Sequence, residues 1–243
     1  MQKLNFTKDY HFFTVQGEGL HTGRPAIFLR LSGCNLRCEW VNSDGTTSLC
    51  DTPYSSHQPE KLLKSIDEVV EDIKSYPCKY VVITGGEPYL QKAIAPFISE
   101  LKNLGYYVCI ETNASIYFET EADFISMSPK LSTSCVDKSE NYESHQKRRK
   151  NIEALASFTK QHDYQFKFVI NTKDDLLEAK ELIAEIEAKT SAIAKDKILL
   201  MPQAVTKKQL EEKSEQVIEW AMEFGYSFCD RMHIRIWNDK RGV

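Results

Sequence analysis

The feature that most constrains this chain is a group of three cysteines that follows an apolar segment. Cys34 and Cys38 are separated by three residues, and Cys50 comes after a further eleven, Glu39 to Leu49. Residues 26–31 before them form a near-continuous apolar run, which is typical of a buried parallel strand. Thiolates are the usual protein ligands of iron–sulfur clusters, and three protein ligands leave one iron of a four-iron cluster open. We therefore expect a reactive metal centre in the loop that leaves this strand.

Short apolar strands alternate with helices along the rest of the chain. Strands are expected at 80–84, 106–111, 124–128, 165–170, 198–201 and 232–237, and helices at 91–104, 141–160, 174–194 and 207–224. Ser65 and Glu68 form a capping box that opens an earlier helix. Alternation of this kind predicts a parallel sheet with crossover helices. No repeat, low-complexity segment or linker interrupts it, so we expect a single domain over residues 1–243, with an enlarged cluster-binding loop at 34–52.

Composition narrows the class of protein. The net charge of −4 argues against a strong electrostatic interaction with nucleic acid, which needs a basic surface. No apolar run approaches the roughly 20 residues of a membrane span, and residues 1–11 lack the apolar core of a signal peptide. We expect a cytoplasmic protein without membrane contact. Seven cysteines do not make a disulfide scaffold, and we interpret the four scattered ones as small buried side chains: Cys78, Cys109, Cys135 and Cys229.

Three features have two readings each. Residues 12–18 lead into a Gly-Glu-Gly turn, which is either a plain turn or a loop that approaches a ligand. Arg30 interrupts a buried strand, so it pairs either with a structural carboxylate or with a carboxylate of the substrate. The basic run 147–150 is either a nucleic-acid patch or, as we favour, the solvated face of a helix, because an apolar stripe accompanies it.

Five further motifs surround the cysteines in order along the chain: residues 13–19 (FTVQGEG), 84–88 (TGGEP), 111–113 (ETN), 128–130 (SPK) and 233–237 (HIRIW). Together with C-x3-C and Cys50-Asp51-Thr52, this set resembles the radical S-adenosylmethionine (SAM) superfamily and, within it, the 7-carboxy-7-deazaguanine synthases. The resemblance implies an α/β fold, an incomplete (β/α)6 TIM-like barrel. One departure is visible, because the family usually shows C-x3-C-x2-C; we interpret residues 41–49 as a nine-residue insertion.

The resemblance also implies roles for individual residues. Cys34, Cys38 and Cys50 would hold a 4Fe–4S cluster, and Thr52 would bind Mg2+ beside the substrate carboxylate. The catalytic residues would be Glu18, Arg30 and His233. The substrate pocket would comprise Val15, Gln16, Gly17, Glu18, Arg30, Thr84 and His233. SAM would contact Leu49, Cys50, Asp51, Gly85, Gly86, Glu87, Glu111, Ser128, Pro129 and Lys130.

The implied reaction is a radical ring contraction of 6-carboxy-5,6,7,8-tetrahydropterin to 7-carboxy-7-deazaguanine, with loss of ammonia. SAM is used catalytically, and the product serves queuosine and 7-deazapurine biosynthesis. This makes the protein a carbon–nitrogen lyase that acts on a small molecule. It implies a flavodoxin or ferredoxin-type electron donor and a homodimer.

Two other functions compete with this one. A radical SAM activating enzyme would generate a glycyl radical on a partner protein, but such enzymes often carry extra cysteines in an insert, and residues 39–49 contain none. A non-catalytic iron or zinc module would use the cysteines structurally. A structural zinc site normally has four protein ligands, for which His57 or Cys78 is available.

Overall fold

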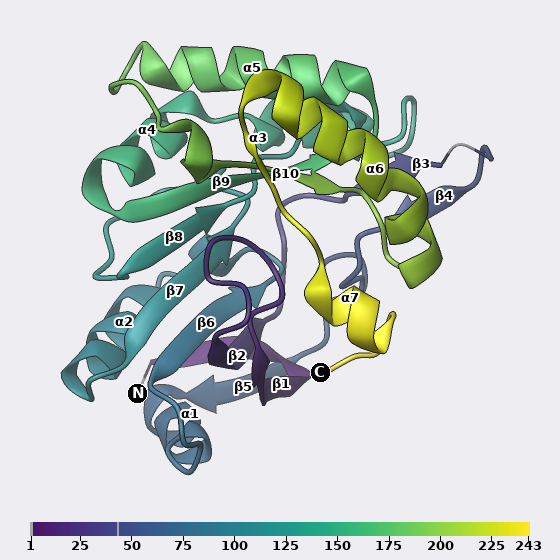
Figure 1. Cartoon of the computed structure of the whole chain (residues 1–243). Coiled ribbons are helices and arrows are strands. Elements are labelled where there is room, and N and C mark those ends of the chain that lie inside the picture. The colour runs from purple at the N-terminus through teal and green to yellow at the C-terminus, as the bar shows by residue number, and fades with distance from the viewer. Residues whose placement is uncertain (1, 43) are drawn as a thin grey trace.

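The protein is built on one nine-stranded sheet, described here from a computed structural model that covers residues 2–42 and 44–243 (Figure 1). Its strand order is β11-β10-β9-β8-β7-β6-β2-β1-β5. Seven neighbouring strands are parallel: β2 (Pro25–Leu31), β6 (Tyr80–Gly85), β7 (Tyr107–Thr112), β8 (Phe124–Met127), β9 (Asp163–Ile170), β10 (Ile198–Pro202) and β11 (Ser227–Phe228). Two antiparallel strands complete the other edge: β1 (Lys3–Val15) and β5 (Leu62–Ser65).

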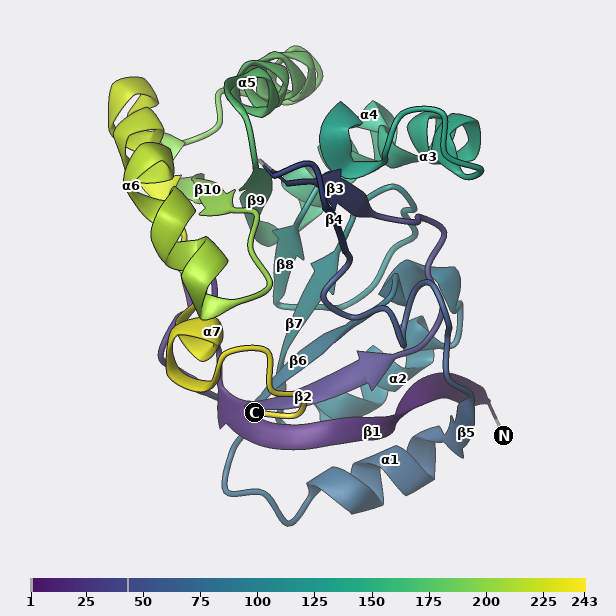
Figure 2. The ribbon, with the colours of Figure 1, turned by 90° about the vertical axis from the view of Figure 1, so that its right-hand side faces the viewer.

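Helices connect most of the parallel strands and cover the outer side of the curved sheet (Figures 1 and 2). They are α1 (Ile66–Ile73), α2 (Ile94–Asn103), α3 (Tyr142–Arg149), α4 (Ile152–Gln161), α5 (Lys173–Glu187) and α6 (Lys207–Phe224), whereas α7 (Met232–Trp237) packs against the turn after β1 on the inner side. Short 3-10 turns lie at Pro88–Leu90, Ser132–Ser134 and Lys195–Lys197. The predicted α/β class with a parallel sheet is confirmed, and β2 with β6 to β10 are six of the seven strands expected from the sequence.

Local sequence signals account for several helix boundaries. The Ser65 hydroxyl accepts from the Glu68 N–H while the Glu68 carboxylate accepts from the Ser65 N–H, as the predicted capping box requires. Thr206 and Gln209 cap α6 in the same way, and Gly225 ends it with φ +69°, a conformation that favours glycine. Helix α6 therefore has the predicted bounds.

Three predicted elements differ from the structure. The helix expected over 174–194 ends at Glu187. The segment 232–237 was expected to be a strand, but it is helix α7, whose one buried apolar side chain is Ile234. Six residues are too few to separate the two periodicities. The helix expected over 141–160 is divided into α3 and α4, because Asn151 is extended and its side chain caps α4 by accepting from the Ala154 N–H.

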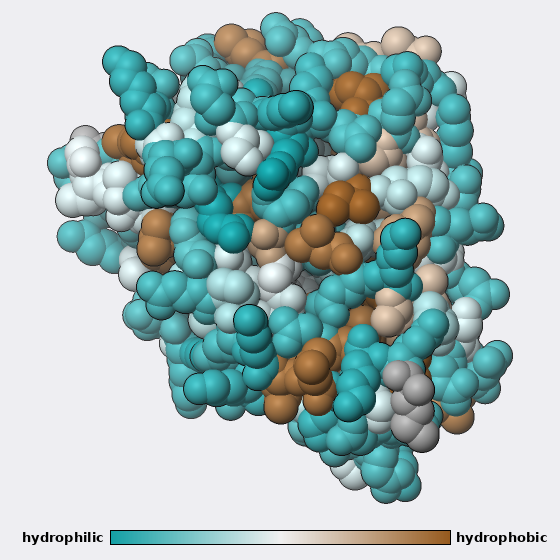
Figure 3. Space-filling model, turned by 180° about the vertical axis from the view of Figure 1, so that it is seen from behind, coloured by the Kyte–Doolittle hydropathy of each residue, from teal (hydrophilic) through white to brown (hydrophobic). Residues whose placement is uncertain are grey.

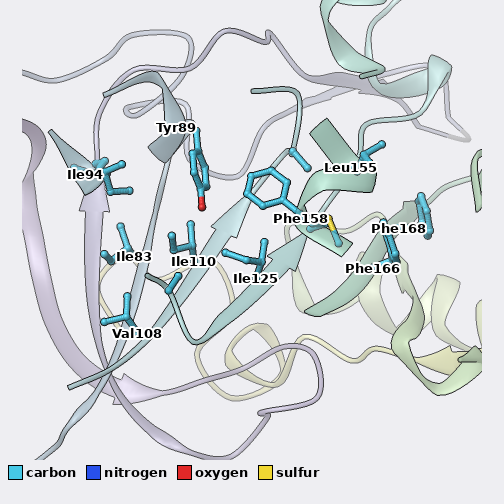
Figure 4. Packing of buried hydrophobic residues seen from close by; sticks show 14 of the residues in the cluster. Ile83, Tyr89, Ile94, Val108, Ile110, Ile125, Leu155, Phe158, Phe166 and Phe168 are labelled. Atoms are coloured by element: carbon cyan, nitrogen blue, oxygen red, sulfur yellow. The ribbon is translucent and has the colours of Figure 1, made fainter. Parts of the chain in front are cut away.

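The alternation of side chains along the parallel strands separates a core from a polar inner face. Outward side chains pack with the helices in one large cluster, shown in Figure 4, including Ile83, Val108, Ile110, Ile125, Phe166 and Phe168. The intervening residues of the same strands point the other way, among them Arg30, Thr84, Glu111, Ser126 and Lys167. Arg30 is in register with Thr84, and Glu111 with Ser126, so these polar groups form one continuous surface.

The face of the molecule opposite to that of Figure 1 is mostly hydrophilic. Figure 3 shows small separated hydrophobic groups on the face opposite to that of Figure 1. All seven thiols are free, and Cys109, Cys135 and Cys229 are buried as predicted, whereas Cys78 is half-buried. Among the helices of residues 2–42 and 44–243, none has the length and apolarity to cross a membrane.

Candidate active site

A cavity of about 340 Å³ lies over the polar inner face, at the carboxyl ends of the parallel strands. Its volume falls within the range of about 300–1,000 Å³ that is usual for ligand pockets. The turn after β1, the cysteine loop, α7 and residues 238–243 complete its wall. Seventeen residues predicted for the site line it: Val15, Gln16, Gly17, Glu18, Arg30, Cys34, Cys38, Cys50, Asp51, Thr52, Thr84, Gly85, Gly86, Glu111, Ser128, Lys130 and His233.

Three residues predicted to contact SAM do not line the cavity: Leu49, Glu87 and Pro129. Leu49 is 43% exposed on the hairpin. Glu87 is fully buried, and its carboxylate accepts from the Tyr89 N–H, the Asn113 N–H and the Thr112 hydroxyl. Burial raises the pKa of Glu87 to about 7, although these three donors oppose the shift. Glu87 thus joins the turn after β6 to the end of β7.

The eleven-residue gap before Cys50 folds into a hairpin of β3 (Glu39–Val41) and β4 (Thr47–Leu49). Glu39 pairs with Leu49, and the Cys50 N–H donates to the Cys38 carbonyl over 3.0 Å. Cys38 and Cys50 therefore flank the base of the hairpin. The insertion, of which Ser43 lies outside the described residues, leaves the two thiols as neighbours in the same cavity wall.

The three thiols of the predicted cluster site lie together at one wall of the cavity. Cys34, Cys38 and Cys50 share a small cluster of contacts and face one cavity. Burial raises the pKa of the Cys34 thiol to about 11, so metal binding there would displace its proton. In the described residues, no three His, Cys, Asp or Glu side chains converge on one ion.

Neither residue that was considered as a fourth zinc ligand lines the cavity with the three thiols. His57 Nε2 lies 3.0 Å from the Cys38 carbonyl, and the Cys78 thiol lies 3.2 Å from the Pro25 carbonyl.

Glu18 is held by two cations that the sequence analysis did not identify. Its carboxylate forms an ion pair with Lys167 and a second with Arg231, whose Nε lies 2.7 Å from Oε1. Burial alone would raise the pKa of Glu18, but Lys167 and Arg231 outweigh it and hold the pKa well below its ordinary value. Glu18 is therefore a carboxylate at neutral pH.

Arg231 also joins the N-terminal turn to the cysteine loop. Its guanidinium donates to Asp51, the residue after Cys50, and to the Ala204 carbonyl. It is 7% exposed and buried between these partners. Three segments that are distant in sequence thus meet at one side chain. Arg231 is a charged residue two positions before His233, and this place beside a recognised motif could have drawn attention to it. Its partners Glu18 and Asp51 lie too far away in the sequence to be inferred.

A hydrogen-bonded row continues from Glu18 along the inner face. Gln16 Nε2 donates to Glu111 over 3.2 Å, and the Thr84 hydroxyl donates to the same carboxylate over 2.9 Å. Lys167 Nζ lies 3.8 Å from Glu111. The row presents donors and acceptors side by side, which suits a flat heterocycle with a polar edge.

Arg30 lines the cavity without a carboxylate partner. Its guanidinium lies 5.8 Å from the centroid of the Phe12 ring. Within the described part of the chain, no carboxylate oxygen lies within 4.0 Å of this guanidinium, the distance that defines an ion pair. Of its two predicted roles, the structure therefore favours recognition of an anionic ligand over a structural pair.

His233 reaches the cavity from α7, not from a strand. Its Nε2 lies 3.8 Å from Glu18 Oε1, and a side chain at Gly17 would approach the imidazole to 2.4 Å. The Met232 N–H donates to the Gly17 carbonyl over 2.9 Å, which fixes the helix against the turn. Burial lowers the pKa of His233, so it is neutral at pH 7 and its ring provides one donor and one acceptor.

Two further groups lie near the thiols. Lys130 Nζ donates to the Ser128 hydroxyl over 2.7 Å and to its carbonyl over 3.0 Å, as one compact unit. Trp40, which the sequence analysis did not select, is buried against the three cysteines and lines the cavity, whereas Leu49 on the paired strand does not. The feature of the sequence that could have identified Trp40 is its position as an aromatic residue directly before the insertion.

Known proteins resemble this chain in sequence and in fold. The Radical SAM superfamily matches residues 29–130. The 7-carboxy-7-deazaguanine synthase of Halobacterium salinarum is 34% identical over 237 residues, 94% of this chain and 89% of that protein. That of Rhodopirellula baltica is 36% identical over 236 residues, 96% of this chain and 86% of that protein.

The crystal structure of QueE from Escherichia coli has a TM-score of 0.66 and covers 95% of both chains at 23% identity, which is evidence of a common fold. Together with the cysteine loop and the polar cavity, the two close relatives establish the family. This chain belongs to the 7-carboxy-7-deazaguanine synthases of the radical SAM superfamily.

Proposed function

We propose that the protein converts 6-carboxy-5,6,7,8-tetrahydropterin to 7-carboxy-7-deazaguanine with loss of ammonia, as a radical SAM lyase of queuosine and 7-deazapurine biosynthesis. The observation that carries the proposal is one cavity that has three thiols at its wall and Arg30 on the sheet, an arginine without an ion pair in residues 2–42 and 44–243. When bound, a 4Fe–4S cluster supplies the electron that cleaves SAM reductively. The chain's own residues bind and orient the pterin and SAM, and they exclude water from the cavity.

The pterin occupies the region around Glu18 and Arg30. The Arg30 fork binds the substrate carboxylate in bidentate fashion. Gln16, Thr84 and neutral His233 hydrogen-bond the polar edges of the ring, and the backbone at Val15 and Gly17 lies beside it. Glu18 stays ionised through Lys167 and Arg231, so it accepts hydrogen bonds from ring N–H groups.

SAM lies between the thiols and the carboxyl ends of β6 to β8. Gly85 and Gly86 let the backbone approach, while Glu111, Ser128 and Lys130 offer groups for its ribose and carboxylate. Asp51 is paired with Arg231 and holds the loop. Leu49, Glu87 and Pro129 lie outside the cavity lining, and in this proposal they support the residues that contact SAM.

Mg2+ is part of the proposal at Thr52. The Thr52 hydroxyl lies 3.5 Å from the Cys50 thiol and lines the cavity. Mg2+ prefers oxygen ligands and keeps several waters, so one hydroxyl and a substrate carboxylate form a suitable partial shell. A cytoplasmic location is part of the proposal, because the seven cysteines of the sequence do not make a disulfide scaffold. A flavodoxin or ferredoxin-type donor and a homodimer complete the proposal.

An anaerobic turnover assay tests this function. The protein is reconstituted with iron and sulfide, reduced with dithionite, and supplied with SAM, Mg2+ and the pterin, and the products are followed by mass spectrometry. We expect 7-carboxy-7-deazaguanine to accumulate without proportional loss of SAM. Cleavage of SAM with an untouched pterin would overturn the substrate assignment. A glycyl radical on a partner protein would support the competing function.

A further inference from the structure

A second, smaller cleft reaches the cysteine loop from outside. It has a volume of about 100 Å³, and Cys34 lines both this cleft and the main cavity. The other lining residues come from the cysteine loop and α3: Asn35, Arg37, Asn141, Ser144, His145 and Arg148. Figure 2 shows α3 above the segment that leads from β2 to β3. The cleft therefore brings the protein surface close to a proposed cluster ligand, without passing through the substrate cavity.

The lining of this cleft is basic. Arg37 donates to the Cys34 carbonyl over 2.8 Å and to the Leu36 carbonyl over 2.9 Å, and Arg148 donates to the Asn35 carbonyl over 3.4 Å. The lining includes no Asp or Glu. In the described ranges, no carboxylate lies within the 4.0 Å ion-pair distance of either guanidinium. Both positive charges are thus held against the loop and left free to meet an anionic partner.

The basic run of the sequence divides into two halves on α3. Arg149 pairs with Glu178 over 2.6 Å and Lys150 pairs with Glu185 over 2.6 Å, so these two anchor the helix to α5. Lys147 and Arg148 are exposed, and neither forms an ion pair within the described residues. Half of the run is therefore structural, and the other half extends the positive charge of the cleft onto the surface.

We propose that this basic cleft, formed by Arg37, Arg148 and the adjoining Lys147, is the docking site of an acidic electron-carrier protein. The inference rests on the proposed function, in which the carrier is oxidised by one electron and the cluster accepts that electron. Electron transfer weakens steeply with distance, so an approach beside Cys34 is favourable. Complementary charge steers such a partner and fixes its orientation. Two of the cations project beyond a shallow cleft, which suits a protein surface rather than a small anion.

Charge reversal at Arg148 tests the proposal in the full reconstituted chain. The dissociation constant of Arg148→Glu for an oxidised flavodoxin is measured by calorimetry at low and high salt. Separately, turnover is driven either by dithionite or by flavodoxin with its reductase. We expect binding to weaken about 10-fold at low salt, with a smaller difference at high salt, because salt screens exposed charges. Flavodoxin-driven turnover should fall in proportion, while dithionite-driven turnover stays at the wild-type rate.

Lys160→Glu is the matched control. Lys160 is exposed on α4 near the start of β9, at the opposite end of the sheet from the cysteine loop. Lys160→Glu changes the net charge by the same amount as Arg148→Glu, and this variant should bind flavodoxin as tightly as the wild type does. Lys147→Glu is a second test variant, because Lys147 is exposed and makes no side-chain hydrogen bond or ion pair in the described residues. Lys147→Glu should weaken flavodoxin binding without disturbing the cysteine loop, which Arg148 contacts and Lys147 does not.

The outcomes separate the two proposals. Equal affinity of flavodoxin for the wild type and both α3 variants would overturn the docking site, whatever the turnover shows. Binding of a short RNA that depends on Arg148, without binding of the electron carrier, would also overturn it. Absence of product with dithionite in the wild type would refute the proposed function, while the affinity comparison would still decide the docking site.

Discussion

Glu18 and Arg231 form a buried ion pair, with 2.7 Å between Oε1 and Nε, across 213 positions of the chain. Their side chains are 10% and 8% exposed. The same guanidinium also binds Asp51, beside the third cysteine. One arginine therefore connects the proposed pterin pocket to the cluster loop, so the two halves of the cavity depend on each other.

Removal of this arginine charge should destabilise the fold strongly. In Arg231→Gln, Glu18 and Asp51 lose a shared cation while Glu18 remains buried. Breaking a buried pair in this way costs about 3–5 kcal/mol. We expect a loss of this size in the free energy of unfolding, measured by urea denaturation of the reduced, cluster-free chain.

The matched control is Arg235→Gln on α7, the helix that Arg231 directly precedes. Arg235 pairs with Asp230, and both side chains are about one-third exposed (35% and 34%). Ion pairs in such partly exposed positions contribute about 0–1 kcal/mol. Equal losses in the two variants would show that burial does not strengthen the role of Arg231.

The Glu18 carboxylate should make stability depend on pH in the acid range. Its pKa in the folded protein lies well below the ordinary value of 4.5, because Lys167 and Arg231 outweigh the effect of burial. A lowered folded pKa gives stability that is present above the unfolded pKa and is lost as pH falls through the folded value. The wild type should therefore exceed Glu18→Gln most at pH 7, and the gap should narrow below about pH 4.5. Urea denaturation of both proteins from pH 7 to pH 3 measures it, and a constant gap would contradict the assignment.

Much of the site could be predicted from the sequence because its residues follow strands. Thr84, Glu111 and Ser128 come directly at or after the carboxyl ends of predicted parallel strands, and such ends meet at one edge of a sheet. Register then places Arg30 beside Thr84. Local periodicity and caps carry this information, so a single sequence reveals it.

The remainder depends on contacts that no local pattern encodes. Lys167 meets Glu18 across 149 positions, and within its strand it is simply one polar residue among apolar ones. The long β1 strand and its partner β5 were not predicted either, since their apolar residues are mixed with charges. Helix α7 was mistaken for a strand because its length is only six residues.

Substitution of Gly86 should disturb the cluster loop. A Cβ at this position would lie 2.0 Å from the Gly33 carbonyl, immediately before Cys34, so the loop has to move. Overpacking of this kind costs about 1–3 kcal/mol or more. We expect Gly86→Ala to retain less iron after reconstitution. Gly23→Ala is the comparison: its φ of +89° is strained for alanine, but nothing lies within 4 Å. Equal iron contents in the two variants would show that the close approach of Gly86 to Gly33 does not matter for the cluster loop.

The third cluster ligand should be Cys50 and not Cys78. Cys50 is adjacent to Cys38 at the base of the hairpin, whereas the Cys78 thiol contacts the Pro25 carbonyl, away from the cavity. We expect Cys50→Ala to lose the visible absorbance of the 4Fe–4S cluster and Cys78→Ala to keep it. A normal cluster spectrum in Cys50→Ala would show that Cys50 is not the third cluster ligand.

Thr52 should govern the response to magnesium without affecting the cluster. Its hydroxyl lines the cavity 3.5 Å from the Cys50 thiol, and its carbonyl accepts from the hydroxyls of Ser55 and Ser56, which hold the loop independently of the side chain. Thr52→Ala therefore removes one oxygen ligand and leaves the loop in place. We expect stimulation by Mg2+ to disappear while cluster absorbance and SAM binding stay at wild-type levels, measured by turnover at varied Mg2+ and by calorimetry. Thr52→Ser, which keeps the hydroxyl, should retain the stimulation. An unchanged magnesium dependence in Thr52→Ala would place the ion elsewhere, because a site built on this hydroxyl cannot survive its loss.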